Sequence, residues 1–116
     1  MPFDGTEANL RNLAGILRDQ TKWPTYFQWD YTRPATCAIG LSQVLWGSNV
    51  LDAMSPEANN LIAHRLGIIL RLPMHDVKPR YVADAIDTYL TFGEVDATTL
   101  KHRVKLTFGD RFRRWW

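Results

Sequence analysis

The single cysteine of this chain, Cys37, precedes an almost wholly apolar stretch and is the first candidate for covalent chemistry. Thr36 is a favourable helix N-cap, which places Cys37 near the first position of a helix predicted over residues 37–46. Backbone N–H groups at a helix N-terminus stabilise a thiolate, the nucleophilic form of cysteine. His75 could accept the thiol proton, and Asp76 beside it could orient the imidazole. These residues give one hypothesis: a cysteine hydrolase or transferase.

The same cysteine is also well placed to be a core residue, and this interpretation is favoured. On a helix its face is shared by the residues at i+3, i+4 and i+7, which are Gly40, Leu41 and Val44. Most of the remaining positions are apolar as well, which is typical of a buried helix. Free cysteine packs as a small hydrophobe, and apolar surroundings disfavour a thiolate. We therefore expect Cys37 to be buried, and the sequence favours a protein that is not an enzyme.

The second candidate site is the basic and aromatic C-terminal segment. Residues 101–116 carry six basic side chains and one acidic, a net charge of +5, whereas the first hundred residues carry eight and eleven, a net charge of −3. Lys and Arg neutralise phosphates while aromatic rings stack on bases, and Arg and Trp are also enriched at protein-interface hot spots. The proposed contact residues are Arg111, Arg113, Arg114, Trp115 and Trp116.

Several partners fit this segment. An acidic protein surface would complete its charge, a nucleic acid would supply phosphates and bases, and an anionic membrane surface also attracts cationic Trp-rich segments. Alternatively, its rings could pack on the core as a structural strap while the Arg side chains reach solvent. Among the binding functions, contact with another protein is favoured. The sequence thus predicts a small adaptor, inhibitor or accessory factor, a class that includes proteins borne by phages and mobile elements.

The remaining chemistry-bearing residues do not predict a metal or another cofactor. His and Cys residues lack the paired spacings of zinc sites, and the glycines stand singly rather than in a phosphate-binding loop. Asp84 and Asp87 share one helix face at i and i+3, where we expect them to keep the helix soluble.

The bulk composition is that of an ordinary globular chain. Its 116 residues, 46% hydrophobic and 22% charged, correspond to one domain. One cysteine cannot form an intramolecular disulfide, and no apolar run of this sequence is long enough to span a membrane. Because the first ten residues carry acids and no apolar run, we expect no secretory signal. We expect a soluble cytoplasmic protein with a globular domain over residues 1–109 and a tail over 110–116.

Helix signals dominate the elements that must position these residues. A first helix is predicted from Asp4, at capping-box spacing from Glu7, to the Trp23–Pro24 pair. Its apolar stripe follows helical spacing through Leu10, Leu13, Ala14 and Leu17.

Three later helices have start or stop signals of their own. Ser55 and Pro56 begin a helix that runs to about Leu66 and is closed by Gly67. Pro79 begins another helix that ends at Gly93. A last helix is expected from Asp96 and uses Leu100 and Val104.

A small strand element is the one β feature that the sequence allows. In residues 26–31 the side chains of Phe27, Trp29 and Tyr31 would share one face of an extended strand. Residues 67–72 could form a second short strand or continue as a helix up to Pro73. The predicted fold class is mainly α, with α+β at the margin: four to five short helices around a central apolar helix 37–46, with at most two strands near 26–31 and 67–72.

Overall fold

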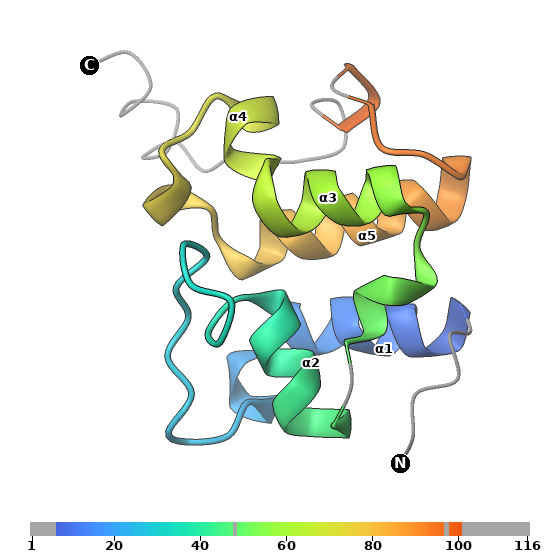
Figure 1. Cartoon of the computed structure of the whole chain (residues 1–116). Helices are drawn as coiled ribbons and strands as arrows, with labels where there is room; N and C mark the ends of the chain where they lie inside the picture. Colours follow the sequence, from blue (N-terminus) through green and yellow to red (C-terminus); the bar gives the residue numbers. More distant parts are fainter. Residues whose placement is uncertain (1–6, 48, 97, 101–116) are drawn as a thin grey trace.

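The chain folds into a compact bundle of short helices (Figure 1), which confirms the mainly α prediction. The computed structural model describes residues 7–47, 49–96 and 98–100. Within them the helices follow the order α1 (Glu7–Arg18), η1 (Gln20–Lys22), α2 (Ala38–Trp46), η2 (Val50–Ala53), α3 (Pro56–His64), α4 (Leu66–Leu70), η3 (Met74–Asp76) and α5 (Pro79–Phe92), where η marks a short 3₁₀ helix. None of the described helices is long and apolar enough to cross a bilayer.

The most extensive helix–helix contact joins α1 and α5, which lie side by side in opposite directions (Figure 1). The stripe predicted on the first helix forms its buried face: Leu10, Leu13, Ala14 and Leu17. The buried face of α5 includes Tyr81, Val82, Ala85 and Ile86. Because residues three and four apart share a helix face, these two stripes meet along the length of the pair.

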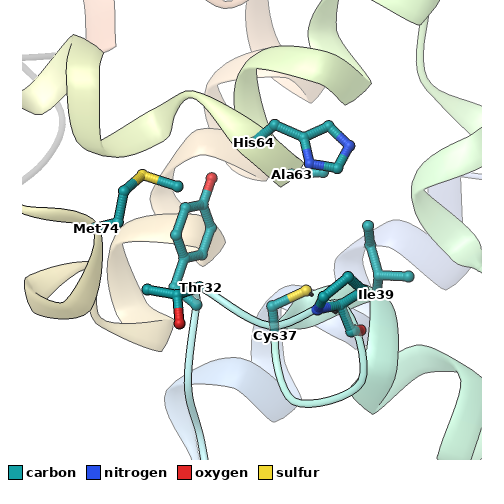
Figure 2. Close-up of a pocket in the computed structure, with 8 residues that line it drawn as sticks. Thr32, Cys37, Ile39, Ala63, His64 and Met74 are labelled. Atoms are coloured by element: carbon teal, nitrogen blue, oxygen red, sulfur yellow. Dashed lines mark hydrogen bonds between the residues drawn. The ribbon is translucent and has the colours of Figure 1, made fainter.

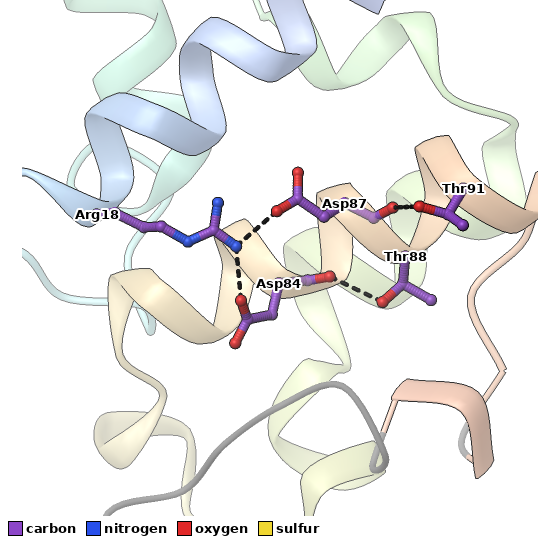
Figure 3. Close-up of polar contacts among 5 residues, drawn as sticks. All are labelled: Arg18, Asp84, Asp87, Thr88 and Thr91. Atoms are coloured by element: carbon purple, nitrogen blue, oxygen red, sulfur yellow. Dashed lines mark hydrogen bonds and ion pairs between the residues drawn. The ribbon is translucent and has the colours of Figure 1, made fainter.

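An ion-pair cluster joins the same two helices (Figure 3). The Arg18 Nη2 atom donates to Asp84 Oδ1 and to Asp87 Oδ2, each at 2.6 Å. Burial opposes the charge on Arg18, but the hydrogen bonds to the two carboxylates outweigh it and raise the pKa of the guanidinium above its ordinary value. Asp84 and Asp87 therefore stabilise the contact between α5 and α1. From the sequence we had expected them only to keep the helix soluble.

Helix α2 has one buried and one exposed side. It buries Ala38, Gly40, Leu41 and Ser42, whereas Val44 is 42% exposed. The expected N-cap, Thr36, instead donates from Oγ1 to the Asp30 carbonyl at 3.2 Å, and Cys37 is the N-cap residue. Gly47 ends the helix in the left-handed conformation, as predicted. The prediction that this nearly all-apolar helix would be buried on every side is therefore wrong, because α2 has a solvent-facing side.

The expected two-strand element is absent from the described residues. The alternation in residues 26–31 is real, because Phe27 and Tyr31 are buried while Gln28 is exposed. A strand needs a neighbouring strand to bind its backbone groups, and the proposed partner, residues 67–72, largely forms α4. Residues 26–31 are therefore an irregular segment with strand-like side-chain alternation.

Two predicted helix ends are displaced by local contacts. Helix α1 stops at Arg18, because Asp19 accepts a hydrogen bond from the backbone N–H of Thr21 at 3.1 Å and caps η1 instead. Gly67 does not close α3: it lies inside α4, where a Cβ atom would come 2.9 Å from the Leu72 carbonyl oxygen. The left-handed position that ends α4 belongs to Arg71, at φ 57°.

Other predicted boundaries are confirmed or lie outside the described residues. The Ser55 side chain caps α3 by accepting from the Ala58 N–H at 3.2 Å, and α5 runs from Pro79 to a left-handed Gly93. Residues 98–100 are helical and Leu100 is buried. The predicted roles of Asp4 and Val104, and the boundary between residues 109 and 110, fall outside the description.

A glycine inside α2 fixes the loop that carries the cysteine. A Cβ atom on Gly40 would come 2.0 Å from the carbonyl oxygen of Ala35. This separation is far below any van der Waals contact, so the loop before α2 can lie on the helix only if residue 40 has no side chain. Ala35 is two residues from Cys37, so the contact also sets the position of the thiol.

We expect Gly40→Ala to lower the free energy of unfolding by about 2 kcal/mol or more, because backbone must move to admit the methyl group. The matched control is Gly15→Ala, at an exposed position of α1 where a Cβ atom meets nothing within 4 Å. This control should raise stability by about 0.5–1 kcal/mol, since alanine is the better helix former. Urea unfolding followed by far-UV circular dichroism measures both. A Gly40→Ala protein as stable as wild type would contradict the close contact.

Candidate functional site

The cysteine predicted to be buried is buried. Cys37 is 2% exposed, and its Sγ atom donates to the Pro34 carbonyl at a sulfur–oxygen distance of 3.6 Å. It contributes one wall of a small pocket of about 80 Å³ between the loop before α2 and the end of α3 (Figure 2). Ile39 and Ala63 contribute apolar surface to the same pocket. Cys37 is thus a buried residue beside a small pocket that opens to the surface, where the lining residues Thr32, Pro34 and His64 are exposed.

The histidine that shares this pocket is His64 rather than His75. His64 lies in the last turn of α3 and lines the pocket together with Cys37 and Met74 (Figure 2). His75 is 75% exposed on η3, where its Nε2 atom lies 3.7 Å from Asp76 Oδ1. The structure therefore brings the proposed base and its orienting acid together, but does not place either among the described residues that line the Cys37 pocket.

The side chain of Tyr31 lines the same pocket and binds the backbone of α3 and α4. Its hydroxyl donates to the Ile62 carbonyl and accepts from the Leu66 N–H at 3.2 Å, so it connects the end of α3 with the start of α4. Burial raises the pKa of the Tyr31 hydroxyl, which keeps it protonated and able to donate. Its sequence signal was only the alternation of residues 26–31, which indicates burial but cannot identify a partner helix.

The other expected sites give different outcomes. Among the residues that the structure describes, no group of three or more His, Cys, Asp or Glu side chains could hold a metal ion. The proposed binding residues all lie outside the description: Arg111, Arg113, Arg114, Trp115 and Trp116.

A second pocket, which the sequence did not predict, lies at the C-terminal end of α1. It is about 240 Å³ in volume, and we call it the basic pocket because Arg18, Lys78 and Arg80 line it together with Trp23. These residues come from two stretches about sixty positions apart, so no local motif could have predicted their meeting.

Folded protein should resist alkylation at Cys37, because the thiol is enclosed by the loop before α2. We expect iodoacetamide to modify it slowly near neutral pH and rapidly once denaturant is added, with the extent measured by intact-protein mass spectrometry. Fast modification of the folded chain would show an accessible thiolate and would favour the cysteine-enzyme hypothesis.

Tyr31→Phe should lower the free energy of unfolding by about 1–3 kcal/mol, because it leaves the Ile62 carbonyl and the Leu66 N–H unsatisfied. The folded-state pKa of Tyr31 is raised above its ordinary value of 10.0, so wild-type stability must fall as the pH rises above that value. The variant lacks this contribution, and its stability deficit should shrink. Chemical denaturation at neutral pH and just above pH 10 tests this; a constant deficit would contradict it.

Comparison with known proteins adds no relative. No family model matches the chain, and neither the curated proteins nor the solved structures contain a match. What the chain can do is therefore inferred from its own residues.

Proposed function

We propose that this protein acts by binding another protein, with residues 110–116 as its main contact segment. The observation that carries the proposal is the uneven charge: +5 over residues 101–116 against −3 over the first hundred residues. Residues 110–116 lie within this positive region, which is opposite in charge to the rest of the chain and would attract an acidic partner.

The side chains of the segment suit such a contact. Arg111, Arg113 and Arg114 can form paired hydrogen bonds with carboxylates, and Trp115 and Trp116 can bury large apolar surfaces. These are the residue types that contribute most of the binding energy in protein interfaces. The enclosed thiol of Cys37 also favours a binding function over thiol chemistry.

Nucleic-acid binding is the second candidate, and the same segment supports it. Cations alternating with aromatic rings bind single strands through phosphates and stacked bases. The two candidates differ in salt dependence, since each phosphate contact releases counterions and steepens the loss of affinity with salt.

The test replaces charges and keeps the full chain. The segment variant changes three arginines to glutamine: Arg111, Arg113 and Arg114. A matched control changes three arginines of the described body that are exposed: Arg11, Arg33 and Arg65. Affinity purification from the native host, followed by a binding titration with the recovered partner, should show affinity lost at least tenfold in the segment variant and within about twofold in the control.

Thermal unfolding of both variants separates binding from folding. We expect the melting temperature of the segment variant to stay within a few degrees of wild type. A large drop would mean that the segment is a structural strap and would remove the motive for the proposal. Equal loss of partner binding in both variants would show non-specific charge attraction. Salt-steep binding to a mixed-sequence single-stranded oligonucleotide, without a protein partner, would favour the second candidate.

A further inference from the structure

The outer face of α4 carries three exposed side chains in a row. Arg65, Ile68 and Arg71 follow one another at a spacing of three residues, whereas Leu66 and Leu70 are buried. Ile68 is 65% exposed. Neither arginine forms an ion pair with any residue that the structure describes. The three side chains, which we call the α4 face, thus place an apolar group between two cations that the described chain leaves unpaired.

The backbone of Arg71 indicates that its side chain has a use outside the fold. Arg71 occupies the left-handed position that ends α4, at φ 57° and ψ 43°, and the N–H of Leu72 donates to the Gly67 carbonyl at 2.8 Å. Helices α2 and α5 have Gly47 and Gly93 at the corresponding position. A residue with a Cβ atom is less stable there than glycine, so an arginine at this position weakens the fold. Backbone strain of this kind indicates a function for the residue that bears it.

The other end of α3 has the complementary charge. There the start of α3 lies beside the end of α5, where the Ser55 N–H donates to the Tyr89 hydroxyl at 3.2 Å (Figure 1). Phe92, which shares a face of α5 with Tyr89, is 54% exposed. The exposed carboxylates next to these helix ends, which form no ion pair with a cation of the described chain, are Asp52, Glu57, Glu94 and Asp96. We call these carboxylates together with Phe92 the acidic end.

The α4 face and the acidic end do not meet within one chain. Glu57 and Arg65 are eight residues apart, which corresponds to roughly 12 Å along a helix. Helix α3 between them is fixed by its buried residues, Ala58, Ile62 and Ala63. A second copy, however, can bring its acidic end to the α4 face of the first without a change in either fold. Opposite charges at two different places on one body favour such a head-to-tail contact.

We propose that copies of this chain associate head to tail, with the α4 face of one copy on the acidic end of the next. Arg65 and Arg71 donate to carboxylates of the acidic end, and Ile68 packs against Phe92 of the second copy. Each copy keeps one surface of each kind open, so a third copy can add. The contact is small and charged, so the association is weak and falls with salt. It does not involve the C-terminal segment of the proposed function.

Sedimentation velocity of the full chain tests the contact. At low salt the weight-average sedimentation coefficient of the wild type should rise with protein concentration up to the submillimolar range. The rise should largely disappear at about 1 M salt, where charges are screened within roughly 3 Å.

Two charge-reversed variants test the pairing of the surfaces. One carries Arg65→Glu with Arg71→Glu, and the other carries Glu57→Lys with Glu94→Lys. Each alone should sediment as a monomer at every concentration, because like charges then face each other. An equimolar mixture should associate again, since the intact acidic end of the first variant meets the intact α4 face of the second. The matched control, Arg11→Glu with Lys22→Glu, reverses two exposed cations elsewhere and should associate like the wild type.

Arg71→Gly separates binding from folding, because it removes the side chain and the backbone strain together. Its melting temperature, measured in dilute solution, should rise by a few degrees. Its self-association should nevertheless weaken at least about fivefold, since one of the two cations is lost. A more stable protein that associates as well as the wild type would contradict the proposal.

Four other outcomes would overturn it. Three are a wild type that stays monomeric at low salt, self-association that survives in both charge-reversed variants, and a mixture of these variants that does not associate. The fourth concerns the full-length variant with Arg111, Arg113 and Arg114 changed to glutamine. It should associate like the wild type, and loss of association there would assign the acidic end to the C-terminal segment instead of the α4 face.

Discussion

The structure depends on how the irregular segment 24–37 is held between the helices. This segment pairs with no strand among the described residues, and aromatic side chains fix its place. The Trp29 indole N–H donates to the Val77 carbonyl at 2.8 Å, just before α5, and the Tyr31 hydroxyl donates to Ile62 in α3. The rings of Trp23, Trp29 and Tyr31 follow one another at centroid distances of 6.1 and 6.3 Å. One stretch of chain thereby connects α1, α3 and α5.

Both pockets follow from this arrangement. At one end of the aromatic row, Tyr31 and the loop that follows it enclose Cys37; at the other end, Trp23 forms a wall of the basic pocket. The Cys37 thiol becomes a packing group of the core. The buried thiol and the charge of the C-terminal residues 101–116 are the observations behind the proposal that the protein acts by binding.

Local signals predicted the parts of the fold that local forces determine. The stripe from Leu10 to Leu17, the Ser55 cap and the Pro79–Gly93 boundaries all lie within a few residues of the features they specify. The burial of Cys37 also followed from its apolar neighbours. The contacts of Arg18 with α5 could not be predicted, because they join residues more than sixty positions apart. The prediction of a strand near 26–31 was wrong for the same reason. The side-chain alternation was correct, but local sequence does not specify whether a distant segment will pair with it as a second strand.

Native-state hydrogen exchange in segment 24–37 tests most directly whether this segment belongs to the rigid core. The N–H of Asp30 donates to the Thr36 carbonyl at 3.0 Å, and those of Thr36 and Cys37 both donate to the Arg33 carbonyl at 3.1 Å. If the aromatic anchors hold the segment, these amides exchange only through global unfolding, as slowly as the central amides of α5. Fast exchange of these three amides while α5 stays protected would show that the segment opens by itself, which would expose Cys37 and contradict the account.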